Sequence, residues 1–168
     1  PFNLLIQKFG KEQNLYFYNF ALGDKTEEST IYTNTNNLNM SSSILKPKKV
    51  LNYHKFLTFE GTESITIKKF SDLNIVNVDF LNIDTQGYEL KVWKGFQNLN
   101  NINFIKTEIH RKEYYTDCIL VKELDKYLNN FGFIRVKTLW WKLTEPWGDA
   151  LYIKKDQIST LKYSELRL

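Results

Sequence analysis

Strand-like and helix-like segments alternate in the second half of the chain, and this alternation constrains the fold more than any other feature. Residues 78–84 (VDFLNID) form a short and nearly continuous apolar run, which is typical of a strand covered on both faces. Leu90, Trp93 and Phe96 follow at three-residue spacing and predict a helix. Residues 104–110 (FIKTEIH) predict the next strand. Such alternation indicates an α/β fold with a mostly parallel sheet and helices on both sides.

The remaining segments fit one domain. Asp117 is the predicted N-cap of a further helix, whose apolar face ends at Gly132. Two more strands, over residues 133–141 and 149–155, predict a closing hairpin. No repeat or second composition is visible, so residues 1–168 are predicted to form a single domain. In the first half we predict a helix over 2–9, strands over 15–22, 29–33 and 64–70, and a loop over 34–49.

Composition excludes several classes of protein. No apolar run approaches the roughly 20 residues needed to cross a bilayer, so no membrane span is predicted. Cys118 is the single cysteine and cannot form an internal disulfide, which suits a reducing compartment and predicts a cytoplasmic location. The net charge of +4 is mild and mixed along the chain. Without a recognisable nucleic-acid-binding pattern, it predicts no nucleic-acid partner.

Several motifs are absent from the chain. None of the seven glycines forms a G-x-G-x-x-G turn or a P-loop. Either no nucleotide-like cofactor binds, or the glycine turn lies upstream of Pro1. Cys118 stands alone, and His54 and His110 lack ligand-spaced partners, so no metal site is predicted. A serine hydrolase is also disfavoured, because there is no G-x-S-x-G elbow.

Residues 79–95 (DFLNIDTQGYELKVWKG) resemble the signature of the FkbM family of S-adenosylmethionine-dependent methyltransferases. In that signature a strand ends in I-D-x-x-G-x-E and a helix with a late K-G follows. Four other segments agree in order and spacing: NFALGD at 19–24, SSSI at 41–44, FIKTEIH at 104–110 and WGDALYI at 147–153. The resemblance implies a Rossmann-like class I methyltransferase fold of three layers, with a mostly parallel sheet and a C-terminal antiparallel hairpin. It also implies that the family's first strands and glycine turn precede Pro1, so that the domain is N-terminally incomplete.

The resemblance assigns the catalytic role first to Asp84, at the end of the central strand. Its carboxylate is expected to orient the acceptor hydroxyl or a cofactor group, or to take the hydroxyl's proton. The alternative is that Asp84 caps a helix beginning near Gln86. Glu89 is expected to be structural, because a helix N-terminus favours negative charge.

Glu108 and His110 are the other predicted catalytic residues. They are two residues apart on one strand, so both side chains face the same way. Glu108 matches the family's acidic position, and a histidine near its ordinary pKa of about 6.5 is a plausible proton acceptor. The alternative for His110 is an ordinary strand-end histidine with a satisfied hydrogen bond.

Further residues are assigned to cofactor and substrate binding. By the resemblance, Ala21 and Leu22 pass the adenine of the cofactor, although strand-end packing is the alternative. Ser42 and Ser43 could bind the cofactor carboxylate or the substrate, or could simply be solvated. The predicted substrate-binding residues are Gln86, Trp147, whose aromatic face suits a sugar but also suits core packing, and Asp149, which could instead serve a turn.

The sequence therefore predicts an S-adenosylmethionine-dependent O-methyltransferase acting on a hydroxyl of a sugar, glycan or small molecule. The alternative is a non-catalytic methyltransferase-like domain that binds a glycan or a protein partner. An acidic residue and a glycine turn upstream of Pro1 would favour the enzyme.

Overall fold

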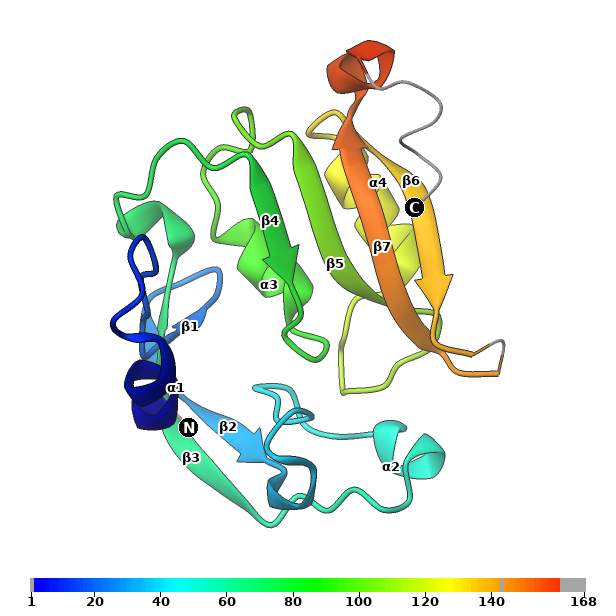
Figure 1. Ribbon diagram of the computed structural model, residues 1–168. Helices are drawn as coiled ribbons and strands as arrows, with labels where there is room; N and C mark the ends of the chain where they lie inside the picture. The colour runs from blue at the N-terminus through cyan, green and yellow to red at the C-terminus, as the bar shows by residue number, and fades with distance from the viewer. Residues whose placement is uncertain (1, 143, 161–168) are drawn as a thin grey trace.

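The computed structural model describes residues 2–142 and 144–160, and within them it holds two separate β-sheets with α-helices around them (Figure 1). The elements in chain order are α1 (Phe2–Phe9), β1 (Ala21–Leu22), β2 (Glu27–Thr33), α2 (Val50–Tyr53), β3 (Gly61–Lys68), β4 (Phe80–Ile83), α3 (Glu89–Lys94), β5 (Phe104–His110), α4 (Val121–Asn129), β6 (Phe133–Trp140) and β7 (Trp147–Lys154). Short 3-10 turns lie at Thr35–Asn37, Phe70–Asp72 and Lys155–Thr160.

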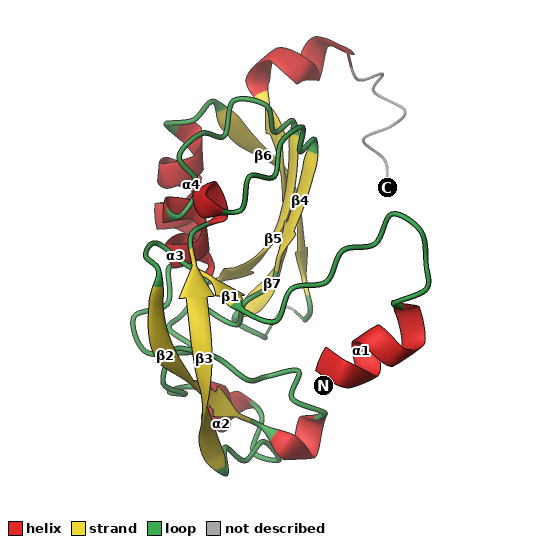
Figure 2. Cartoon of the chain, turned by 90° about the vertical axis from the view of Figure 1, so that its left-hand side faces the viewer, coloured by secondary structure: helices red, strands yellow, loops and turns green. Residues whose placement is uncertain are grey.

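The larger sheet has the strand order β4-β5-β7-β6. β4 runs parallel to β5, whereas β7 runs antiparallel to both of its neighbours. The predicted hairpin of the last two strands is confirmed. Figure 1 shows α3 and α4 behind this sheet, and the turned view in Figure 2 places both on the same side of it.

The smaller sheet has the order β1-β3-β2, with β1 parallel and β2 antiparallel to β3. Both sheets are therefore mixed, and the prediction of a mostly parallel sheet is not confirmed. The predicted three layers, with helices on both faces, are also not seen among the described residues. Three strand pairs are antiparallel: β2 with β3, β5 with β7, and β6 with β7. The last pair is a hairpin, whose two strands must run antiparallel.

The main core lies between the larger sheet and its helices. Trp93 of α3 is completely buried, and Ile105 and Ile109 of β5 and Leu124 and Leu128 of α4 pack in the same cluster. A smaller core joins α2 to the loop after β5; it contains Val50, Leu57, Tyr114, Tyr115 and Cys118. This second core places α2 and the segment before it opposite the carboxyl ends of β4 and β5.

Local predictions agree with the structure best where the hydrophobic pattern is strong. Residues 104–110 form β5 with the predicted bounds, and residues 2–9 form α1. Residues 15–22 do not form one long strand, because only Ala21–Leu22 pairs with β3. The prediction that β4 is covered on both faces is wrong: β4 lies at the edge of its sheet, and Phe80 is 52% exposed.

One predicted role at a helix end needs correction. Asp117 does not cap α4, whose N-cap is Leu120, and Glu123 accepts a hydrogen bond from the Leu120 amide at 3.2 Å. Asp117 instead adopts a left-handed backbone conformation with φ of 60° in the preceding loop.

None of the helices in the described part of the chain has the length and apolar character needed to cross a membrane.

Candidate active site

The parallel pair β4 and β5 brings the ends of both strands to one edge of the larger sheet. A cavity of about 250 Å³ opens there, which we call the β4–β5 cavity. Asp84, directly after β4, and Glu108, within β5, both line it. The other lining residues come from the loop after β2, from α2 and its flanks, and from the segments around β5 and β7: Asn37, Met40, Ser41, Val50, His54, Phe56, Leu57, Gln86, Tyr114 and Trp147.

A second cavity of about 260 Å³, the β1–β4 cavity, lies on the side of the smaller sheet. Ala21 and Leu22 of β1 line it, together with Asp84. Its remaining lining is largely apolar: Phe20, Ile44, Asn82, Ile83, Thr85, Tyr88 and Val92. Asp84 therefore borders both cavities.

The turn between β4 and α3 is held by the carboxylate of Glu89. Glu89 Oε1 accepts hydrogen bonds from the amides of Thr85 and Gly87, each at 3.0 Å, and from the Thr85 hydroxyl at 3.2 Å. Gln86 and Gly87 have φ angles of 53° and 96°, so the chain reverses tightly enough to leave Asp84 at the cavity edge. By accepting these three hydrogen bonds, Glu89 has a structural role at the start of α3.

Asp84 does not cap the following helix. α3 begins at Glu89 with Tyr88 as N-cap, and no side chain caps it by a hydrogen bond. Instead Asp84 Oδ1 accepts a hydrogen bond from Gln86 Nε2 at 2.7 Å, and the Asp84 side chain is exposed. The capping hypothesis is therefore wrong, and the carboxylate stays available to a ligand.

Gln86 is clamped by three other elements. Its side-chain oxygen accepts a hydrogen bond from the Tyr115 hydroxyl at 3.1 Å, and its carbonyl accepts one from the Ser43 hydroxyl at 2.7 Å. Gln86 Nε2 also lies 3.4 Å from Glu108 Oε2. One amide group thus lies between the carboxylates of Asp84 and Glu108.

Glu108 and His110 are both buried, and their side chains share one face of β5. Burial, and then the charges of Glu89 and Asp84, raises the pKa of Glu108 well above its ordinary value of 4.5. Burial lowers the pKa of His110 to about 4, and it raises the pKa of Glu89 to about 7. A carboxyl group with a raised pKa is a stronger base once it has lost its proton.

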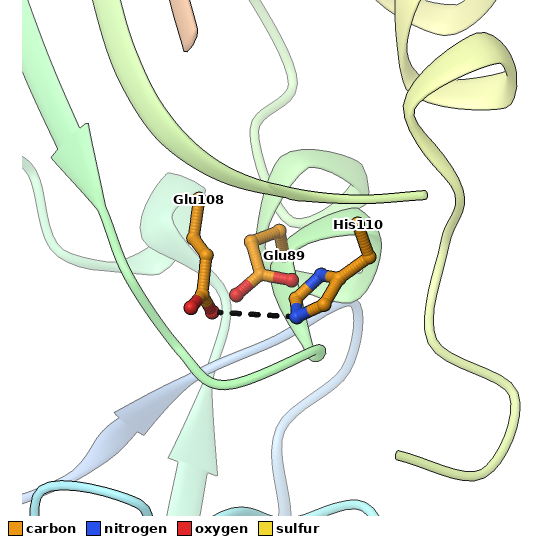
Figure 3. Close-up of side chains that lie close together, drawn as sticks. All are labelled: Glu89, Glu108 and His110. Carbon is orange, nitrogen blue, oxygen red and sulfur yellow. Dashed lines mark ion pairs between the residues drawn. The ribbon is translucent and has the colours of Figure 1, made fainter. Parts of the chain in front are cut away.

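His110 is not the hydrogen-bonded histidine that the alternative interpretation expects. Neither ring nitrogen has a hydrogen-bond partner among the described residues. His110 Nε2 lies 3.7 Å from Glu108 Oε2, and His110 is not among the residues that line either cavity (Figure 3). His110 therefore lies beside Glu108 rather than at the cavity surface.

The two predicted serines lie elsewhere. The hydroxyl of Ser43 is buried, donates to the Gln86 carbonyl and accepts from the Leu45 amide at 3.0 Å. Ser42 Oγ accepts from the Asn34 amide at 3.0 Å and lines a hollow beside β2 and β3. Among the serines of this stretch, Ser41 lines the β4–β5 cavity.

The two predicted residues of β7, Trp147 and Asp149, lie in different surroundings. Trp147 lines the β4–β5 cavity and stacks on Trp141, with ring centroids 5.5 Å apart and planes 13° apart. Asp149 lies opposite Glu108 in the antiparallel register and forms an ion pair with Lys106 at 3.2 Å. Asp149 lines neither cavity.

Tyr114 and His54 are among the cavity residues that sequence reasoning missed. The Tyr114 hydroxyl lies 2.9 Å from His54 Nε2 and donates to Glu145 Oε2 at 3.3 Å. Burial raises the pKa of Tyr114, so its hydroxyl stays a hydrogen-bond donor. Periodicity within residues 34–57 could not predict the position of His54, because that position depends on a contact with Tyr114, which lies far along the chain after β5.

Comparison with known proteins gave one finding. A family model described as the methyltransferase FkbM domain matches residues 3–135. The curated proteins and the solved structures gave no match.

Proposed function

The chain belongs to the FkbM methyltransferase domain family, and from this premise we propose that it transfers a methyl group from S-adenosylmethionine to a hydroxyl of a sugar or other small molecule. The observation that carries the proposal is the position of Asp84, which borders both the β1–β4 cavity and the β4–β5 cavity. A donor in one cavity and an acceptor in the other would meet at this carboxylate.

The β1–β4 cavity suits part of the cofactor. Its walls are mostly apolar, which fits a purine ring, and the polar groups of Asp84 and Thr85 lie at the end of β4. Ala21 and Leu22 would hold the adenine by packing from β1. When bound, S-adenosylmethionine supplies an electrophilic methyl group on a sulfur that leaves as a neutral thioether.

The β4–β5 cavity suits a small hydroxylated acceptor. Its volume of about 250 Å³ is below the roughly 300–1,000 Å³ of pockets for drug-sized ligands, so a single sugar ring or a terminal residue fits best. Trp147 offers an aromatic face, and Asn37, Ser41 and Gln86 offer hydrogen-bonding groups. The mixture of one aromatic wall and several polar groups is typical of sugar recognition.

Asp84 and Glu108 both act on the acceptor hydroxyl. Asp84 orients the hydroxyl toward the β1–β4 cavity, and orientation of this kind contributes roughly 7–11 kcal/mol to lowering a barrier. Either Asp84 or Glu108 takes the proton as the new bond forms, and Gln86 Nε2, 2.7 Å from Asp84 and 3.4 Å from Glu108, holds both in place. His110 acts as a positioning residue behind Glu108.

The test compares the two aspartates that flank β4, Asp84 after the strand and Asp79 before it. Tritiated S-adenosylmethionine is incubated with the protein and a panel of monosaccharides, oligosaccharides and small alcohols, and transfer of label is measured. Asp84→Asn is expected to lower kcat by about a hundredfold or more, with the free energy of unfolding changed by less than about 1 kcal/mol. The matched control is Asp79→Asn, at the opposite, exposed end of β4, which should transfer label at the parental rate.

Two results would contradict the proposal. If Asp84→Asn turned over as fast as Asp79→Asn, Asp84 would have no part in the chemistry. If the protein bound S-adenosylhomocysteine but labelled none of these hydroxyl compounds, the hydroxyl specificity would be wrong.

A further inference from the structure

Three buried side chains that could ligate a metal converge beside the β4–β5 cavity. Glu89 comes from the first turn of α3, and Glu108 and His110 come from the end of β5 (Figure 3). They are 0%, 5% and 1% exposed, and one ligand atom from each lies within 4.8 Å of the other two. Figure 3 shows the Glu89 carboxylate between the side chains of Glu108 and His110.

Several polar atoms of this cluster have no hydrogen-bond partner among the described residues. Glu89 Oε1 accepts three hydrogen bonds, whereas Glu89 Oε2 has no partner among the described residues. Both ring nitrogens of His110 also lack a partner there. Each buried unsatisfied group costs about 1–3 kcal/mol, and a single ion at this point would pair with Glu89 Oε2 and with one of the two His110 ring nitrogens.

Charge points to a cation. Two carboxylates lie together in a buried region, and the histidine beside them has no hydrogen bond that would favour its charged form. A buried negative cluster of this kind is stabilised by a bound metal ion or by protons. The three hydrogen bonds to Glu89 Oε1 hold its carboxylate in one orientation, which is how outer partners fix a metal ligand.

We propose that Glu89, Glu108 and His110 bind a divalent transition-metal ion of the Mn²⁺ or Zn²⁺ class. One imidazole with two carboxylates suits these ions better than Mg²⁺ or Ca²⁺, which prefer oxygen ligands alone. Metal–ligand bonds of about 2.0–2.2 Å place neighbouring ligand atoms roughly 3–3.5 Å apart, so the cluster contracts by about 1 Å on binding.

The site has both an entry path and open coordination positions. Glu108 lines the β4–β5 cavity, so an ion can reach the cluster from solvent. Three protein ligands leave positions for water or for another oxygen ligand. The sequence predicts no metal site because Glu89 belongs to a different element from Glu108 and His110, and only the fold brings it to them.

The test measures metal binding directly and does not depend on methyl transfer. The chelator-treated chain is titrated at neutral pH with Mn²⁺, followed by the electron paramagnetic resonance signal of the free ion, and with Zn²⁺, followed by calorimetry. One equivalent is expected to bind with micromolar or tighter affinity. His110→Ala and Glu89→Gln are each expected to weaken binding by about tenfold or more.

The matched control is His54→Ala, which removes a histidine of the β4–β5 cavity outside the cluster and should leave metal affinity unchanged. Circular dichroism checks that each variant folds, and Glu108→Gln replaces any variant that does not. If the folded parent bound neither ion, the cluster would hold a proton instead and the proposal would be wrong. Equal affinity in the parent and all cluster variants would overturn it as well.

Discussion

Replacing Gly87 by alanine is expected to destabilise the turn that holds the candidate site. It follows Gln86 in the turn after β4, and its amide donates to Glu89 Oε1 at 3.0 Å. Its φ of 96° lies in the region that side chains with a Cβ rarely adopt. A Cβ built there would also lie 2.9 Å from Cys118 Cβ and 3.1 Å from Tyr115 Cδ2.

The expected loss in Gly87→Ala has two parts. A residue with a Cβ in a left-handed conformation costs roughly 1–2 kcal/mol. Forcing a methyl group against packed side chains costs about 1–3 kcal/mol, because Cys118 and Tyr115 belong to the smaller core and have little room to move. The free energy of unfolding should therefore fall by about 2–5 kcal/mol, a large part of the roughly 5–15 kcal/mol of a typical domain.

Urea unfolding followed by tryptophan fluorescence and by circular dichroism measures this loss. The control is Gly61→Ala at the start of β3, where an added Cβ would meet only Thr33 Oγ1, at 3.7 Å. That variant should stay within about 0.5 kcal/mol of the parent. If Gly87→Ala fell less than about 1 kcal/mol below Gly61→Ala, the turn would be more adaptable than the reasoning allows.

Two further predictions concern single side chains. Ser43→Ala removes a buried hydroxyl that links the Gln86 carbonyl to the Leu45 amide, so the free energy of unfolding should fall by about 1–3 kcal/mol; parental stability would show that this link contributes nothing. His110→Gln should change how stability depends on pH in metal-free protein. Because burial lowers the pKa of His110 to about 4 from 6.5, its contribution is present above pH 6.5 and is lost as the pH falls toward 4. Relative to His110→Gln, the parent should lose about 3 kcal/mol over that window in urea titrations, and parallel curves would contradict the lowered pKa.

Much of the fold could be predicted because local patterns determine local structure. Residues 104–110 form β5 with the predicted bounds, and the spacing of Leu90, Trp93 and Phe96 predicts the helix that follows β4. Asp84 and Glu108 were both assigned to catalysis from the sequence, and they meet at one edge because the ends of neighbouring parallel strands lie together. These inferences need only the repeat of a strand or a helix and the order of elements.

What the sequence could not predict depends on partners far along the chain. Strand order is one example. The pattern of β4 gives no sign that its other edge has no partner in the described residues, and nothing in the sequence indicates that β7 lies between β5 and β6. Neighbouring serines are another, because the bridge from Tyr32 to Ser43 buries Ser43 and leaves Ser41 at the cavity.

The sequence by itself determined the elements, the family signature and the edge of the sheet where the chemistry is expected. Only the tertiary structure decided which side chains share that edge. It brought His54 to Tyr114 and Glu89 to Glu108 and His110, and it moved Asp149 away to Lys106. The physical reason is that periodicity reports how a segment is covered, whereas contacts between segments are set by how whole elements pack together.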